Sequence, residues 1–174
     1  MNRMNLKFDL QKKLMETLDE IVKHYRSLLT VVRKEKEILV AAELDKLSEN
    51  NKVKEELILK IKALDGKRLK IAQELADCLS IEGEDNLRLH ILAGHFEGKE
   101  SEKMMNVKSV LELIIKRVVE LNKFNEELVK SALNNITGAM DNIKNTLSEE
   151  TTYKKKSIGK YKTARAGSLV SKEA

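Results

Sequence analysis

Proline and tryptophan are absent from this sequence of 174 residues, and the only aromatic residues are three tyrosines and three phenylalanines. The absence of proline removes the commonest interruption of a helix. The shortage of aromatic side chains means that Leu, Ile, Val and Met must supply nearly all of the buried apolar surface. Charged residues make up 35% of the chain. This composition is typical of long helices and coiled coils rather than of a compact mixed fold.

Cysteine and long apolar runs are also scarce. Cys78 is the single cysteine, so no disulfide can form within the chain. The longest strongly apolar run, residues 38–42, is far too short to span a bilayer. Residues 1–7 contain no apolar region of the kind found in secretory signals. We therefore expect a soluble cytoplasmic protein.

The positive charge of the chain is concentrated at its C-terminal end. Residues 148–174 carry seven Lys or Arg and three Glu, a net +4 of the total +5, so the rest of the chain is nearly balanced. Six positive charges lie between Tyr153 and Arg165. This segment could be a solvated end, a segment that becomes ordered on a protein surface, or a site for phosphate contacts. Of these three, we favour binding of nucleic-acid phosphates least, because residues 1–147 contain no second basic patch. We therefore expect no nucleic-acid partner.

The sequence contains no arrangement of residues typical of an enzyme. No Ser/His/Asp grouping, glycine-rich nucleotide loop or paired CxxC motif occurs. His90 and His95 are five residues apart near Glu97, whereas helical metal ligands are usually three or four apart. The carboxylates are spaced along the helices as partners of lysines. We expect neither catalysis nor a metal or cofactor.

Two long helices are predicted in the first half of the chain, at about residues 5–43 and 44–79. Each has an apolar seam whose residues are three or four positions apart, as in a coiled coil. The first seam consists of Leu14, Leu18, Ile21, Tyr25, Leu28, Val32, Glu35 and Leu39; the second runs through Leu44, Leu47, Asn51, Lys54, Ile58, Ile61, Leu64, Arg68, Ile71, Leu75 and Leu79. Because the join has neither glycine nor proline, one continuous rod is an alternative. A hairpin is favoured, since folding back covers both seams.

A break follows, and then a third long helix at about residues 101–147. Gly83, Gly94 and Gly98 interrupt the pattern, and a short helix at 86–97 is predicted to close one end of the bundle. Ser101 is a candidate N-cap of the third long helix. Its seam is formed by Val107, Leu111, Ile114, Val118, Leu121, Asn125, Leu128 and Ala132, and the spacing then changes at Ile136, Met140, Ile143 and Leu147. Such a change of step indicates local unwinding or a new contact face.

These elements predict an all-α fold: an antiparallel coiled-coil bundle of three long helices with a short linker helix in residues 1–147, followed by a flexible basic tail at 148–174. Four seam positions are polar, namely Glu35, Asn51, Lys54 and Asn125. One interpretation is that they control the register of the helices, because a polar seam residue disfavours wrong pairings. The other is that they face a partner that is bound only part of the time. We favour register control.

Two stretches resemble a known family. The first is the sequence VAAELDKLSENNKVKEEL from Val40 to Leu57, continued by IKALDGKR at residues 61–68; the second is LNKFNEELVKSALNNI at residues 121–136, followed by Thr152-Tyr153 and Gly159. This ordered set resembles the FlgN family of flagellar export chaperones over about residues 10–170. The extra alanine at position 132 and the second Tyr–Gly unit of the tail depart from the family pattern. Tyr153, rather than Tyr161, is the closer match to the family's tyrosine.

The resemblance implies a protein that binds the C-terminal helical region of hook–filament junction (hook-associated) proteins. Such a chaperone prevents premature self-association of its client and delivers it to the type III export gate at the membrane. The expected partner-binding residues are Leu121, Asn122, Asn125, Leu128, Leu133, Ile136, Met140, Ile143, Leu147, Tyr153 and Gly159. The alternatives are a structural coiled-coil protein and, less favoured, a nucleic-acid-binding helical protein. Whether free chains form a homodimer is left open.

Overall fold

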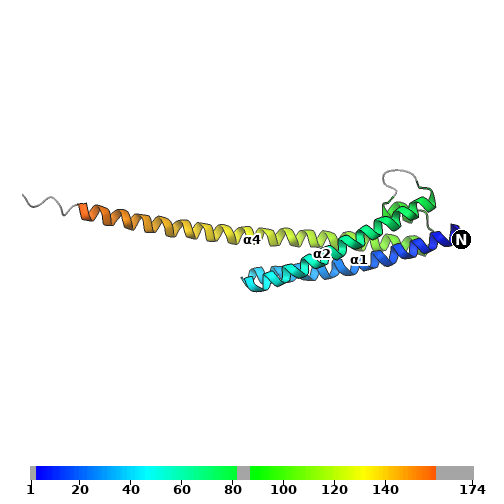
Figure 1. The fold of residues 1–174 in the computed structure, drawn as a ribbon, viewed down its shortest axis with the longest axis horizontal. Coiled ribbons are helices and arrows are strands. Elements are labelled where there is room, and N and C mark those ends of the chain that lie inside the picture. Colours follow the sequence, from blue (N-terminus) through cyan, green and yellow to red (C-terminus); the bar gives the residue numbers. More distant parts are fainter. Residues whose placement is uncertain (1–2, 82–86, 160–174) are drawn as a thin grey trace, which may run out of the picture. The chain divides into compact units, whose positions relative to one another are not determined.

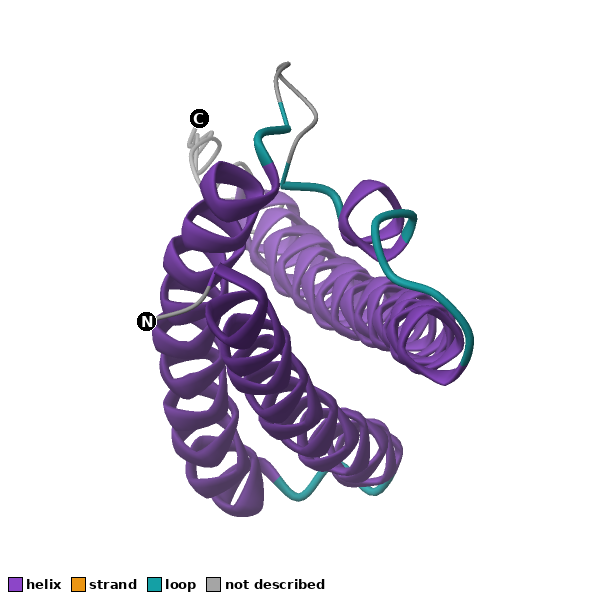
Figure 2. Cartoon of the chain, turned by 90° about the vertical axis from the view of Figure 1, so that its right-hand side faces the viewer, coloured by secondary structure: helices purple, strands orange, loops and turns teal. Residues whose placement is uncertain are grey.

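The computed structural model of the chain describes residues 3–81 and 87–159, with side chains for 5–81 and 87–147. The described residues form helices and loops and contain no strand (Figure 2). The helices are α1 (Arg3–Val40), α2 (Leu44–Leu79), α3 (Leu89–Ala93) and α4 (Lys99–Gly159). The all-α prediction is therefore confirmed. The chain divides into two compact units, Met1–Leu128 and Val129–Ala174, which we call the first and second units.

Helices α1 and α2 run in opposite directions and are joined by a tight turn (Figure 1). The N–H of Glu43 donates to the carbonyl of Ile38 at 3.1 Å, and the N–H of Ala42 donates to that of Leu39 at 3.2 Å. This pair of bonds is the Schellman motif, which ends a helix with one left-handed residue. Ala42 takes that conformation, with φ of 56°. The chain is therefore a hairpin here and not a continuous rod, although the turn lacks the glycine that usually marks it.

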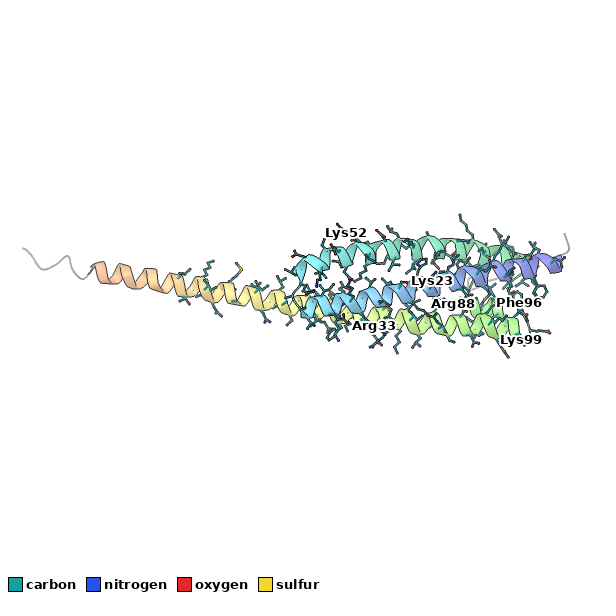
Figure 3. The ribbon with its side chains drawn as sticks, turned by 90° about the horizontal axis from the view of Figure 1, so that it is seen from below. Lys23, Arg33, Lys52, Arg88, Phe96 and Lys99 are labelled. Carbon is teal, nitrogen blue, oxygen red and sulfur yellow. The ribbon has the colours of Figure 1, made fainter. Side chains whose placement is uncertain are left out.

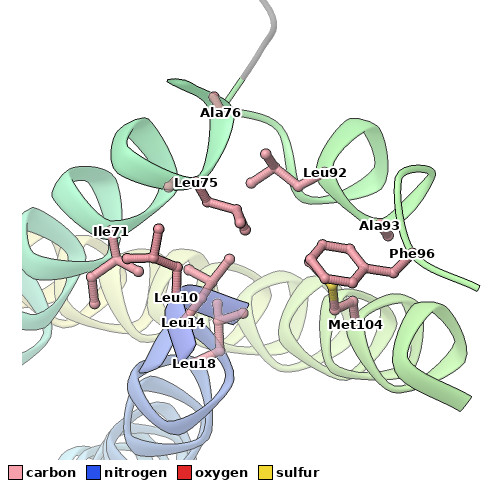
Figure 4. Close-up of a cluster of buried hydrophobic side chains, with 11 residues drawn as sticks. Leu10, Leu14, Leu18, Ile71, Leu75, Ala76, Leu92, Ala93, Phe96 and Met104 are labelled. Atoms are coloured by element: carbon pink, nitrogen blue, oxygen red, sulfur yellow. The ribbon is translucent and has the colours of Figure 1, made fainter. Parts of the chain in front are cut away.

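The first hydrophobic cluster lies where α1, the end of α2, α3 and the start of α4 meet (Figure 4). Leu14, Leu75, Leu92 and Met104 come from these four helices, and none is more than 1% exposed. Phe96, just after α3, is buried in the same cluster. The short helix thus covers the core at this end of the first unit. The sequence predicts that helix at 86–97, and the structure gives it as Leu89–Ala93. Residue 86 and the predicted break at Gly83 lie outside the described part of the chain.

The second hydrophobic cluster holds the middle of the first unit together. Its buried residues come from α1, α2 and α4: Val22, Leu28, Val32, Ile61, Ile114, Val118 and Leu121. The regular seam of α4 therefore packs inside the first unit as far as Leu128, which is half-buried. Ala132, the next residue of the predicted seam, is exposed. Leu44 of the α2 seam is also 73% exposed, because it lies at the turn.

Helix α4 starts earlier and ends later than the sequence predicts. It begins at Lys99, directly after Gly98, whose φ of +60° is a conformation that glycine adopts without strain. The prediction that Ser101 is the N-cap is therefore wrong, since Ser101 lies inside the helix. At the other end the helix continues to Gly159. No proline is present to end it at residue 147. Residues 160–174 are not described, so a flexible tail there stays a prediction.

Candidate functional site

An exposed row of apolar side chains follows the helix of the second unit. We call it the apolar stripe; it consists of Val129, Leu133, Ile136, Met140, Ile143 and Leu147. The last five residues are between 59% and 64% exposed, and Val129 is 47% exposed. Every residue from 131 to 147 is exposed. Figure 3 draws the described side chains of α4 as sticks. The stripe therefore lacks the cover that every core residue of the first unit has.

The stripe keeps the spacing of a coiled-coil seam. Its steps are four, three, four, three and four residues, which place all six side chains on one face of a helix. It is one residue out of step with the seam that ends at Leu128. From Val129 to Leu147 it spans about 27 Å at about 1.5 Å per residue. A helical partner of similar length would match it.

The polar residues near the stripe do not interrupt the helix. The hydroxyls of Thr137 and Thr146 donate to the carbonyls of Leu133 and Asn142, at 3.0 and 2.9 Å. These bonds stay within the helix and leave the apolar face uncovered. Gly138 has no atom within 4 Å of the place where a Cβ would stand. It lowers helix stability by about 1 kcal/mol relative to alanine and makes this segment easier to adapt to a partner.

Four of the expected partner-binding residues lie in the first unit. Leu121 is 9% and Asn125 is 3% exposed, and both contact the protein's own helices. Asn122 and Leu128 are half-buried. These four therefore belong to the first unit and not to the exposed stripe, and their role in partner binding stays a prediction.

The remaining expected residues lie in the second unit. Leu133, Ile136, Met140, Ile143 and Leu147 all belong to the apolar stripe, whereas Val129 was missed because the regular seam was followed past it. The step of four from Val129 to Leu133 was the available signal. Tyr153 lies within α4, but its side chain is outside the described residues, and Gly159 is the last residue of the helix. Their role also stays a prediction.

Three of the polar seam residues come together in the first unit. Glu35 of α1 accepts hydrogen bonds at one oxygen, Oε2, from Lys54 Nζ of α2 at 2.7 Å and from Asn125 Nδ2 of α4 at 3.1 Å. Asn125 also donates to the carbonyl of Val32 at 3.0 Å. Its own Oδ1 is buried without a hydrogen-bond partner among the described residues. The group joins three helices at one level of the bundle.

This arrangement favours register control over partner binding for the polar seam. The side chains of Glu35 and Lys54 are only 12% and 21% exposed, so shifting either helix would leave a charge poorly paired away from water. Asn51, the fourth polar seam residue, is half-buried. Its neighbour Asn50 is 5% exposed and donates to the carbonyl of Val31 at 3.3 Å. Asn50 was missed because it lies one residue off the seam.

We expect Lys54→Ala to lower the free energy of unfolding by about 1–2 kcal/mol, because the Glu35 carboxylate would lose its cation while remaining largely buried. Urea denaturation monitored by circular dichroism measures this change. The matched control is Lys46→Ala, which breaks the exposed Lys46–Glu43 pair and should cost less than about 0.5 kcal/mol. In a protein that already carries Glu35→Ala, Lys54→Ala should also lower the free energy of unfolding by less than about 0.5 kcal/mol. An equal cost in both backgrounds would show that the two side chains are not coupled.

A groove lies between α2 and α4 in the first unit. Two hollows, of about 630 and about 300 Å3, share Arg68, Leu111 and Ile115 in their walls. Arg68 is bonded to Asp65 at 2.6 Å, so the charge of this guanidinium is balanced within the protein. Tyr25 lines the smaller hollow, and burial, followed by the Asp65 carboxylate, raises the pKa of its hydroxyl. The phenol is therefore protonated at neutral pH, and these groups suit packing rather than proton transfer.

The histidines and the cysteine are not gathered into one site. Among the described residues no three His, Cys, Asp or Glu side chains lie close enough together to hold a metal ion. His90 and His95 are exposed, and the carbonyl of His95 accepts a hydrogen bond from Lys7 Nζ at 2.8 Å. Cys78 is half-buried beside the first hydrophobic cluster. None of the helices in the described part of the chain has both the length and the apolar character needed to cross a membrane.

A packed helical unit and an apolar seam left exposed on a helix are features of proteins that bind other helices. Comparison with known families agrees with this class: the FlgN protein family matches residues 1–158. The chain therefore belongs to the FlgN family, which is a family of flagellar chaperones. No curated protein and no solved structure matches the chain.

Proposed function

We propose that this protein is a cytoplasmic flagellar export chaperone for hook–filament junction proteins. It binds the C-terminal helical region of its client, prevents premature self-association of that region, and delivers the client to the type III export gate. Family membership supports the chaperone class. The exposed apolar stripe of the second unit is the main support for the client surface that we propose. Its side chains from Leu133 to Leu147 are at least 59% exposed.

The stripe supports this function because it matches what a client helix needs. An amphipathic helix binds a helical surface through apolar residues three and four positions apart, which is the spacing of the stripe. Covering the stripe removes apolar surface from water on both partners, at roughly 25 cal/mol for each Å2. Ordering of a client segment opposes this gain by roughly 2–5 kcal/mol, which keeps the complex reversible. A reversible complex is required of a chaperone that must release its client.

The end of α4 and the residues after it supply a second expected contact. Residues 154–156 are three consecutive lysines, and the segment beyond Gly159 is also basic. Together with Tyr153, these residues are suited to bind an acidic surface of the client or of the export gate. We assign no enzymatic step to the protein.

Analytical ultracentrifugation with and without a client tests the proposal. The probe is the purified C-terminal helical segment of a hook–filament junction protein from the same cell. A chaperone should shift from its free form to a mixed complex of defined mass. If the chain sediments as the same species with and without the segment, the chaperone proposal fails, and a structural coiled-coil protein becomes the better assignment.

A further inference from the structure

A second row of residues without charge lies beside the apolar stripe. We call it the second row; it consists of Ala132, Asn135, Ala139, Asn142 and Thr146, each one residue before a member of the stripe. All five are exposed. The two rows together form a face wider than the two positions per heptad of a simple coiled-coil seam. Wide faces of this kind are typical of helices that pack against more than one neighbour.

Residues 131–147 of the second unit also carry unusually few charges. Between residues 131 and 147 only Asp141 and Lys144 are charged, whereas charged residues make up 35% of the whole chain. A helix that exposes its sides to water permanently usually has charged residues there. The sides of this segment are instead occupied mainly by Ala, Asn, Ser and Thr. The composition of this segment is therefore that of a helix whose two rows are both covered by a partner.

Helix α1 shows what such a pattern means in this protein. It contacts α2 along one side and contributes to the same buried cluster as α4. Beside its seam it buries further uncharged residues, namely Thr17, Val22 and Ile38. Thr17 is only 1% exposed although it is polar, because its hydroxyl donates to the carbonyl of Lys13 at 2.9 Å. A helix between two neighbours in this fold therefore buries some uncharged side chains beside its seam.

We infer that the partner of the second unit supplies two helices rather than one, and that α4 becomes the third helix of a mixed three-helix bundle. This inference rests on the proposed function, because it describes the client's binding region. One client helix covers the apolar stripe, and the other covers the second row. Each is about 18 residues long, as the stripe is about 27 Å at about 1.5 Å per residue. The client surfaces are apolar and bear small or amide side chains opposite Ala139 and Asn142.

Further copies of this chain fit the two rows less well. An antiparallel pair of α4 helices supplies one neighbour and leaves one row exposed. Three parallel helices would cover both rows, but they would align residues 154–156, three consecutive lysines in α4, from each copy. Like charges aligned in this way oppose assembly. A different chain with two helices avoids this repulsion.

The test compares two pairs of glutamate substitutions in the full-length protein. Ala139→Glu with Asn142→Glu places two charges on the second row and leaves the stripe intact. Asn134→Glu with Asn145→Glu is the matched control, because these two positions share the side of the helix opposite both rows. Isothermal titration with the C-terminal segment of a hook–filament junction protein measures binding. Circular dichroism checks that both variants have the helix content of the unsubstituted protein.

We expect the second-row variant to bind at least about tenfold more weakly, because unpaired glutamates would be buried against a client helix. The control should bind within roughly threefold of the unsubstituted protein, since its charges stay in water. Unchanged binding by the second-row variant, together with loss of binding when Ile136 is replaced by aspartate, would overturn the two-helix inference and leave the chaperone function standing. Absence of binding by the unsubstituted protein would instead overturn the proposed function.

Discussion

Replacing Ile136 and Ile143 by aspartate is expected to weaken binding of a client segment at least about a hundredfold while leaving the first unit as stable as before. Each side chain is about 60% exposed in the free protein and would be covered in the complex. A carboxylate in that position must lose its water without gaining a partner, which costs several kcal/mol for each group. A loss of about 2.8 kcal/mol already corresponds to a hundredfold change in affinity.

The first unit supplies a matched control for this prediction. Leu113 and Val119 lie on the same helix and are 70% and 60% exposed. They belong to the first unit and not to the stripe. Leu113→Asp with Val119→Asp should leave client affinity within roughly threefold, because two exposed charges there remain in water. Titration calorimetry compares the variants. Equal losses in both would indicate a general effect of charge on α4 and would contradict the assignment of the stripe.

Ending the chain at Leu128 is expected to abolish client binding and to leave a folded first unit. The buried residues of both hydrophobic clusters end at Leu121, and the Glu35–Lys54–Asn125 group is retained. The truncated protein should therefore unfold cooperatively, with a midpoint within about 5 °C of the transition of the full chain. Thermal unfolding by circular dichroism measures this, and the same preparation is used for titration with the client segment.

Two results would contradict this second prediction. Loss of cooperative unfolding after truncation would show that residues beyond Leu128 are needed for the fold of the first unit. Retained binding would place the client surface within residues 1–128, where the groove bounded by Arg68, Leu111 and Ile115 would be the next candidate. The two readouts are independent, so each claim is tested separately.

The helical class and the α4 seam as far as Leu128 are predictable because apolar residues at steps of three and four record which face is buried. The α1–α2 turn is harder, since Ala42 is left-handed without being glycine. Hydrogen bonds from backbone N–H groups to the carbonyls of Ile38 and Leu39 hold Ala42 in that conformation. No residue type in the sequence predicts these bonds. The hairpin therefore had to be argued from the need to cover two seams.

The candidate site was predictable only in part, for a physical reason. A seam pattern shows that one face of a helix is suited to burial. It does not show whether that face packs against the protein's own helices or against a partner. Leu121 and Ile136 have the same pattern in sequence, yet one is 9% and the other 59% exposed. The meeting of Glu35, Lys54 and Asn125 depends on how three helices align along their lengths, which spacing within one helix does not fix. Three-dimensional packing was needed to separate the internal seam from the exposed stripe.

Hydrogen exchange of the full chain with and without a client segment tests the central claim most directly. Amide protection reports where a partner orders or covers the backbone. The account predicts that added protection is largest in residues 129–147 and that residues 10–121 of the first unit change little. Added protection confined to the first unit, with residues 129–147 unchanged, would contradict the assignment of the exposed stripe as the client-binding surface.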